Sequence, residues 1–214
     1  MARRPDGTDQ PRTTLVPPTD LDDWDPQPGD VLSGDRIEGK RTGTLDLSGE
    51  RLPDLEVEES VIDTLRADDA DLRGLRVRDT VVRVLDAPVL RASSSTWRDV
   101  RVEGGRVGSA ELYDSGLHGV EFVGMKFGFV NLRGSTITDV VFRDCVVDEV
   151  DIADARLLRV SFDGTTIRSL EGSNTRVEHV DLRGADLSNQ DLRRINLAGA
   201  NLSGANLRLS LIHI

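Results

Sequence analysis

A five-residue period is the feature that most constrains this chain. Of the 35 positions spaced by five between Ile37 and Leu207, 30 hold Leu, Ile, Val, Phe or Trp. The overall apolar fraction of 37% would place apolar residues at only about 13 of them. A period of five matches neither the 3.6 residues of a helical turn nor the two-residue alternation of a strand. The chain is therefore predicted to be neither a helix bundle nor a simple flat sheet.

A three-residue strand followed by a two-residue corner explains the period. We label the central residue of each unit i. Position i−2 shares a strand face with i and is mostly apolar or small, whereas position i−1 is polar or charged and is expected to face water. Position i+2 holds 11 of the 20 glycines and many Asp and Asn residues, which tolerate the positive φ of tight turns. The chain should coil around a narrow interior.

The predicted core is column i, which lies at the centre of every short strand. Its most regular part lies in the second half of the chain. The core residues predicted there are Leu132, Ile137, Phe142, Val147, Ile152, Leu157, Phe162, Ile167, Leu182, Leu187, Leu192, Leu197 and Leu202.

A second period, of ten residues, sets the number of sides. In column i−2, large residues such as Leu65 alternate with small ones such as Ser60 and Ala70. Positions ten apart lie on opposite faces of a four-sided coil, so this alternation fills a square interior without voids. Twenty residues per coil give about eight coils, and at ~4.8 Å per stacked strand the rod is roughly 40 Å long.

The alternation of large and small residues reverses phase between Leu85 and Leu90, next to Pro88. One explanation is an irregularity at residues 86–96, in which one pentapeptide is looped out so that large residues return to their former faces. The alternative is that large and small residues exchange faces without a loop.

The last third of the chain has the cleanest repeat. Residues 181–189 and 196–207 follow the order Ala, then Asp or Asn, then Leu, then two variable residues. This closely resembles the pentapeptide-repeat family, and the register extends in degenerate form back to about residue 37. The resemblance implies an all-β fold, a right-handed quadrilateral parallel β-helix, over residues 31–212.

The two flanks differ from the repeat. Residues 1–30 contain six of the eight prolines and are predicted to be a disordered tail, although Trp24 could instead dock on the first coil as a cap. At the other end, Leu211 occupies a polar column and no capping helix follows. We expect either a reading frame that was cut short or ran into foreign sequence, or a bare apolar end that forms a homodimer.

The chemistry-bearing residues do not assemble into a recognisable site. His118, His179 and His213 map to separate corners or to the tail and have no metal-ligand spacing. Cys145 falls at a small inward position, and Glu50, a charge at an inward position, is expected near the open first coil. We therefore predict no catalytic residue, no cofactor, no metal and no enzymatic activity.

Composition narrows the partners and the location. The chain has 38 acidic and 27 basic residues, a formal net charge of −11, which argues against direct nucleic-acid binding. No apolar run approaches the ~18 residues of a membrane span, and the N-terminus has no apolar stretch typical of a signal peptide. With a single cysteine, the chain is predicted to be cytoplasmic and not membrane-bound.

Three hypotheses for function follow. The first is a non-catalytic protein-interaction or scaffold rod with an unknown protein partner. The second comes from the resemblance: some pentapeptide-repeat proteins mimic duplex DNA, bind DNA gyrase and protect it from quinolones, so a topoisomerase is a candidate partner. The third is an enzyme accessory module or a weak enzyme. Basic residues interrupt the acidic columns, and Arg143, Asp163 and Arg183, spaced by twenty, should form a charge ladder in one corner column.

Overall fold

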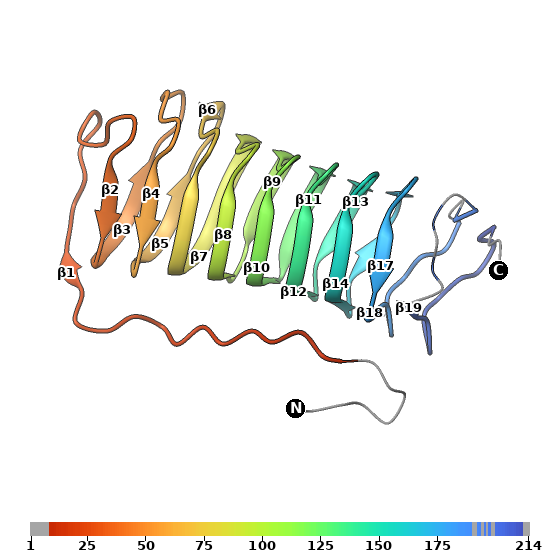
Figure 1. The fold of residues 1–214 in the computed structure, drawn as a ribbon. Helices are drawn as coiled ribbons and strands as arrows, with labels where there is room; N and C mark the ends of the chain where they lie inside the picture. The colour runs from red at the N-terminus through yellow and green to blue at the C-terminus, as the bar shows by residue number, and fades with distance from the viewer. Residues whose placement is uncertain (1–8, 190–191, 194, 196, 198–199, 212–214) are drawn as a thin grey trace.

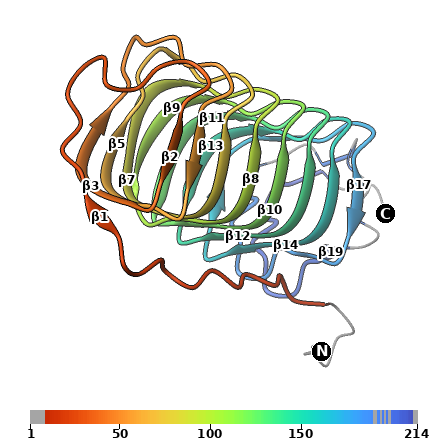
Figure 2. The same cartoon turned by 60° about the vertical axis from the view of Figure 1, so that its left-hand side comes forward.

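The computed structural model describes residues 9–189, 192–193, 195, 197 and 200–211. In the body of the molecule each strand pairs in parallel with residues twenty positions away, as Thr136 does with Gly116 and with Arg156. The described residues form an all-β parallel solenoid of about nine turns and contain no helix (Figures 1 and 2). The prediction of a parallel β-helix with twenty residues per coil is confirmed.

The strands follow one another around the coil and stack along its axis (Figure 1). Their bounds are β1 Asp22–Asp23, β2 Arg36–Glu38, β3 Lys40–Asp46, β4 Glu56–Glu58, β5 Val61–Arg66, β6 Ala70–Asp71, β7 Arg76–Arg91, β8 Thr96–Val102, β9 Gly105–Glu111, β10 Gly116–Val123, β11 Met125–Asn131, β12 Thr136–Arg143, β13 Val146–Asp151, β14 Arg156–Asp163, β15 Thr166–Ile167, β16 Leu170–Glu171, β17 Arg176–Glu178, β18 Val180–Asp181 and β19 Ala200–Asn201.

Each turn has four faces, and we number them along the chain. Face 1 is centred on Trp97, face 2 on Val102, face 3 on Val107 and face 4 on Leu112, and every position recurs twenty residues later.

Within the described residues, no helical segment has the length and hydropathy that crossing a bilayer requires.

The interior consists of the two columns i−2 and i. Eleven of the thirteen predicted core residues are buried, from Leu132 to Leu192, while Leu197 and Leu202 near the C-terminal end are half-buried against the core. Aromatic side chains stack where the register superposes them. The rings of Phe122, Phe142 and Phe162 lie 5.1 and 4.9 Å apart and nearly parallel. Such pairs add dispersion contacts to the burial of apolar area.

Small hydroxyl residues in column i−2 satisfy buried backbone groups. The Ser115 hydroxyl accepts a hydrogen bond from the Ser95 amide at 3.0 Å, and Ser135 does the same for the Ser115 amide. The Ser95 hydroxyl also accepts a hydrogen bond from the indole of Trp97 at 2.8 Å. An unpaired buried amide would be costly, so these serines serve the backbone while filling small spaces.

The corners explain the composition of column i+2. Most positive φ angles of the described residues fall in this column, at Asp, Asn and Gly residues such as Asp54 (60°), Asn174 (58°) and Gly134 (66°). These residue types reach the left-handed region at little cost. On one line of corners the chain instead stays extended, through Val89, Ser109 and Phe129, and strands there run around the corner.

Of the two explanations for residues 86–96, the looped-out pentapeptide is wrong and the exchange of faces without a loop describes the structure. Leu85 pairs with Gly105, Ala87 with Val107 and Leu90 with Ala110, so the twenty-residue register continues unbroken. The large inward residues exchange faces instead: Leu75 is followed one turn later by Ser95, and Thr80 by Val100. The long strand β7 spans the exchange, because neither Val84 nor Val89 takes a positive φ.

The N-terminal segment also departs from the prediction. Residues 1–8 lie outside the described residues, as does residue 212 at the other end. From Asp9 onward the chain is not a disordered tail, because it runs along one side of the rod to β1 (Figure 1). There Asp22 pairs with Lys40, and Trp24 packs against the interior of the first turn. The alternative role of Trp24, a cap on the first coil, describes the structure.

Candidate interaction surfaces

Arginine and carboxylate side chains form ladders across the turns. Nine ion pairs among the described residues join side chains twenty positions apart, for example Arg83 with Asp63 at 2.9 Å. The parallel register places such residues directly above one another. Each exposed pair stabilises the fold by only ~0–1 kcal/mol, but alternating charges prevent repulsion between stacked neighbours.

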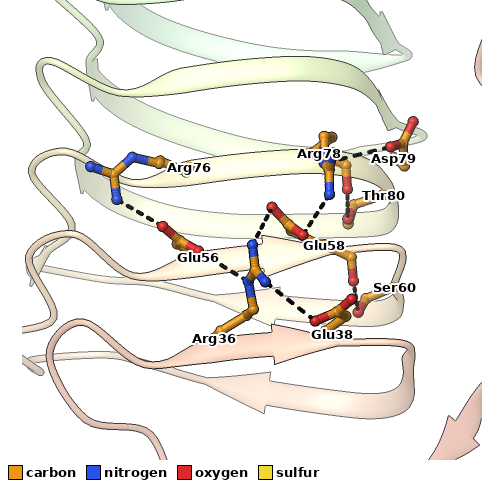
Figure 3. Close-up of polar contacts among 9 residues, drawn as sticks. All are labelled: Arg36, Glu38, Glu56, Glu58, Ser60, Arg76, Arg78, Asp79 and Thr80. Carbon is orange, nitrogen blue, oxygen red and sulfur yellow. Dashed lines mark hydrogen bonds and ion pairs between the residues drawn. The ribbon is translucent and has the colours of Figure 1, made fainter.

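The densest ladder covers face 1 at the N-terminal end (Figure 3). The Arg36 guanidinium of β2 lies 3.1 Å from Glu56 and 3.2 Å from Glu58, both on β4. On the next turn, in β7, Arg76 contacts Glu56 at 2.9 Å and Arg78 contacts Glu58 at 2.7 Å. Glu58 is buried and forms ion pairs with both Arg36 and Arg78. The network therefore links three successive turns.

The carboxylates of this network stabilise the charged form of two of its arginines. The Glu58 carboxylate raises the pKa of Arg36 above its ordinary value, and its hydrogen bond with Arg78 raises the pKa of that guanidinium as well. The Ser60 and Thr80 hydroxyls donate to backbone carbonyls of the same corners at 2.7 Å. Because its carboxylates are paired with arginines of neighbouring turns, we interpret the network as a structural link between turns and not as an acid–base site.

The charge ladder predicted from the sequence forms only in part. Arg143 lies 3.7 Å from Asp163, its partner one turn further along. Arg183 instead hydrogen-bonds through its guanidinium to Asp181 at 3.0 Å, within its own turn. A carboxylate two residues before an arginine lies at the same corner, and it competes with the carboxylate in the neighbouring turn.

Residues 9–19, which we name the strap, are held by a row of carboxylates. The Arg12 amide donates to Asp139 at 2.9 Å, the Thr13 hydroxyl donates to Glu121, and the Thr14 hydroxyl donates to Asp99 at 3.3 Å. These acceptors lie on three successive turns. The strap therefore follows the rod axis along face 2 and the corner that precedes it.

The strap is anchored at a buried ion pair. Both oxygens of Asp139 accept hydrogen bonds from Arg159, at 2.6 and 2.7 Å, and the Asp139 side chain is only 3% exposed. Burial alone would raise the pKa of Asp139, but hydrogen bonds from Arg159 and the Arg12 amide, with the charges of Arg159 and His118, hold it below its ordinary value. Asp139 is therefore a fixed negative charge at neutral pH.

Beneath the strap, the outward column of face 2 breaks the polar rule of position i−1. Val61, Val81 and Val141, which we name the valine stripe, are 4%, 5% and 6% exposed although they belong to this column. They are not part of the interior cluster. Side chains on the outer surface of a strand are shielded only when something lies over them, and the strap passes along this side of the rod.

The described residues bring no nucleophile and base together. His118 and His179 occupy corner positions three turns apart, and His213 lies outside the described residues. Cys145 is buried in the core, where burial raises the pKa of its thiol, and Glu50 is exposed on the first turns. Within the described part of the chain, no group of His, Cys, Asp and Glu side chains could hold a metal ion.

The sequence was compared with models of known protein families and with curated proteins. Residues 173–210 match the family model for pentapeptide repeats, with eight copies, and the five-residue register of that segment continues upstream through the solenoid. Residues 173–210 are pentapeptide repeats. No curated protein sequence matches it.

Two solved structures are similar to this chain at low sequence identity. A trypsin-treated variant of QnrB1, a plasmid-mediated fluoroquinolone resistance protein, is 17% identical with a TM-score of 0.34, and the match covers 87% of this chain and 91% of that one. HetL, involved in heterocyst differentiation regulation in the cyanobacterium Nostoc sp. strain PCC 7120, is 17% identical with a TM-score of 0.32, covering 82% and 86%. At this similarity neither structure bears on the partner of this chain.

Proposed function

We propose that this protein is a non-catalytic rod that binds a partner protein through its outer faces. One observation carries the proposal: core side chains fill the interior over the length of the solenoid, so any recognition must use the outward columns. Those columns repeat at the ~4.8 Å spacing of stacked strands, which makes each face a flat and regular docking surface. We further propose a cytoplasmic location, consistent with one buried, unpaired cysteine.

A set of face-specific variants tests this function. Arg156→Glu with Arg176→Glu alters face 1, and Arg106→Glu with Lys126→Glu alters face 3, while all four positions are outward and leave the core intact. Proteins cross-linked to the wild-type rod in its source cells are compared with those cross-linked to each variant. We expect at least one partner to be lost with one variant and retained with the other. Identical profiles for every altered face would contradict a surface-binding role.

A second candidate function is DNA mimicry directed at a topoisomerase. The net charge of −11 favours it, whereas the arginine–carboxylate ladders oppose it because they neutralise the acidic columns turn by turn. A DNA gyrase supercoiling assay with the purified protein separates the two functions. Inhibition at stoichiometric protein would support mimicry, and unchanged supercoiling at high excess would eliminate it.

The last described turn adds a candidate self-interaction. Leu209 and Leu211 are 77% and 52% exposed there, which supports a homodimer formed through the C-terminal end. Sedimentation equilibrium of the wild-type chain and of Leu209→Asp is the test. A dimer that the substitution dissociates is the expected result, and a monomer at all concentrations would exclude this contact.

A further inference from the structure

We propose that face 2 is a binding surface for an extended peptide, and that the strap occupies this surface in cis as a displaceable ligand. The occupant from outside would be an extended segment of a partner protein with the chemistry of the strap: hydroxyl side chains, prolines and one aliphatic residue. This inference rests on the proposed protein-binding function and assigns it to one face.

The first argument is the pattern of exposure along the strap. Pro11, Thr13 and Leu15 are half-buried, whereas Arg12 and Thr14 between them are exposed. A two-residue alternation is typical of an extended chain that lies with one side against a surface. The strap is therefore bound along its length, as a peptide is bound in a groove.

The second argument is the surface beneath. Outward column residues Val61, Val81 and Val141 would present apolar area to water if nothing covered them, and Glu121 and Asp99 lie nearby as acceptors. An apolar stripe bordered by hydrogen-bond acceptors recognises a chain that offers both an aliphatic side chain and donors. The strap has one half-buried aliphatic side chain, Leu15, which is its candidate for the stripe, and it donates two hydroxyls to the carboxylates.

The third argument is that the strap is held weakly enough to leave. Within the strap only Asp9 forms a β-bridge, and no residue from Gln10 to Thr19 belongs to a strand, so most of the segment does not join the solenoid's ladder. Its contacts with the rod include three hydrogen bonds, each to a carboxylate side chain. Prolines at 11, 17 and 18 have no amide to donate. A second segment of like chemistry can therefore replace it without unfolding a turn.

Two matched variants of the full chain test the proposal. Leu15→Asp places a charge against the valine stripe, whereas Val16→Asp changes the neighbouring side chain, which is 80% exposed, by the same charge. The probe is a fluorescein-labelled synthetic peptide of residues 9–19, followed by fluorescence anisotropy. When the strap occupies face 2 in most molecules, only the remaining fraction of the protein can bind the added peptide. The apparent affinity for the peptide falls in proportion to that fraction. We expect the peptide to bind Leu15→Asp at least tenfold more tightly than either the wild type or Val16→Asp.

A change in the rod identifies the surface. Adding Val81→Asp to Leu15→Asp should abolish peptide binding, while adding Val84→Asp, at an exposed corner of the same strand, should leave it unchanged. Circular dichroism confirms that each variant keeps its fold.

Each of the following results would overturn the inference. Peptide binding to none of the chains would mean that face 2 does not recognise an extended segment. Equal binding to all of them would mean that the strap does not occupy the surface. A concentration-dependent dimer that Leu15→Asp dissociates would place the strap on a second copy instead of in cis. A partner captured through face 1 or face 3 with no peptide binding would leave the general function standing and remove only this inference.

Discussion

Individual side chains in this solenoid have unequal roles that their positions in the five-residue unit determine. Phe142 lies between Phe122 and Phe162 in the interior, whereas Phe129 lies at an outward corner and is half-buried. The two residues are chemically identical, so the difference between them isolates the effect of the interior column.

Phe142→Ala should lower the free energy of unfolding by about 3–5 kcal/mol, because it removes a buried ring and leaves a cavity between two others. Phe129→Ala should lower it by about 1 kcal/mol or less. Urea titrations followed by circular dichroism measure both. Equal effects of the two substitutions would mean that column i is not a distinct interior.

The Asp139–Arg159 pair makes a prediction about pH. The folded pKa of Asp139 is below its unfolded value, so the carboxylate contributes its full stabilisation above about pH 4 and loses it as the pH falls through the folded value. Asp139→Asn should cost roughly 2–4 kcal/mol at pH 7, because Arg159 loses its buried partner. The stability difference between wild type and variant should stay constant from pH 7 to pH 5 and shrink below pH 4.

Asp114→Asn is the control for that measurement. Asp114 occupies the same corner position with a φ of 55°, which Asn tolerates, but its side chain is exposed. Its substitution should change stability little at any pH. A difference for Asp139→Asn that does not depend on pH would show that the ion pair is not the source of the effect.

At the scale of the strand, the exchange of faces around β7 depends on one small residue. Gly105 begins β9 with a φ of 122°, and a Cβ there would overlap the backbone carbonyl of Leu85 in the turn before. Gly116, at the start of β10, has no atom within 4 Å of such a Cβ and no positive φ. The two glycines thus differ in what they permit.

Gly105→Ala should lower the free energy of unfolding by roughly 2–3 kcal/mol, since the backbone must move to relieve the overlap. Gly116→Ala should be neutral or slightly stabilising, because alanine restricts the unfolded chain without a clash. Thermal unfolding of both variants provides the comparison. A neutral Gly105→Ala would contradict the close approach of the two turns at the exchange.

The sequence predicts the positions of the strands, but it does not predict every contact between neighbouring turns. The inward columns follow from apolar periodicity, and the corners follow from Gly, Asp and Asn at i+2, because both are local consequences of side-chain chemistry. The choice between a loop and an exchange at 86–96 was not local, since it depends on whether Leu85 and Gly105 fit together across turns. The partner of Arg183 was predicted wrongly for a related reason. The spacing of twenty pointed to Asp163, whereas the structure pairs Arg183 with Asp181 of its own turn.

At the scale of the whole molecule, the strap is the feature for which the composition led to a wrong prediction. Prolines and polar residues in 1–30 predicted disorder, yet residues 9–19 are ordered by a surface that lies up to 127 positions away in sequence. The sequence feature that indicates an ordered strap lies in the solenoid and not in the N-terminal segment itself. Val61, Val81 and Val141 occupy a column that should be polar. Three valines in the outward column of one face are therefore the feature of the sequence that favours a covering segment.

The central claim is that the chain winds in four-sided turns with columns i−2 and i inside. A cysteine scan of positions 126–146 in the folded protein, with the rate of thiol labelling as the readout, tests it most directly. Native Cys145 is buried and should stay unreactive. The account predicts slow labelling at two positions of every five, such as 130 and 132 and then 135 and 137, with faster labelling at exposed outward and corner positions. Positions 139 and 141 should also label slowly, because both side chains are buried on the side of the rod where the strap lies. Protection with a helical period of 3.6, or uniform labelling, would contradict it.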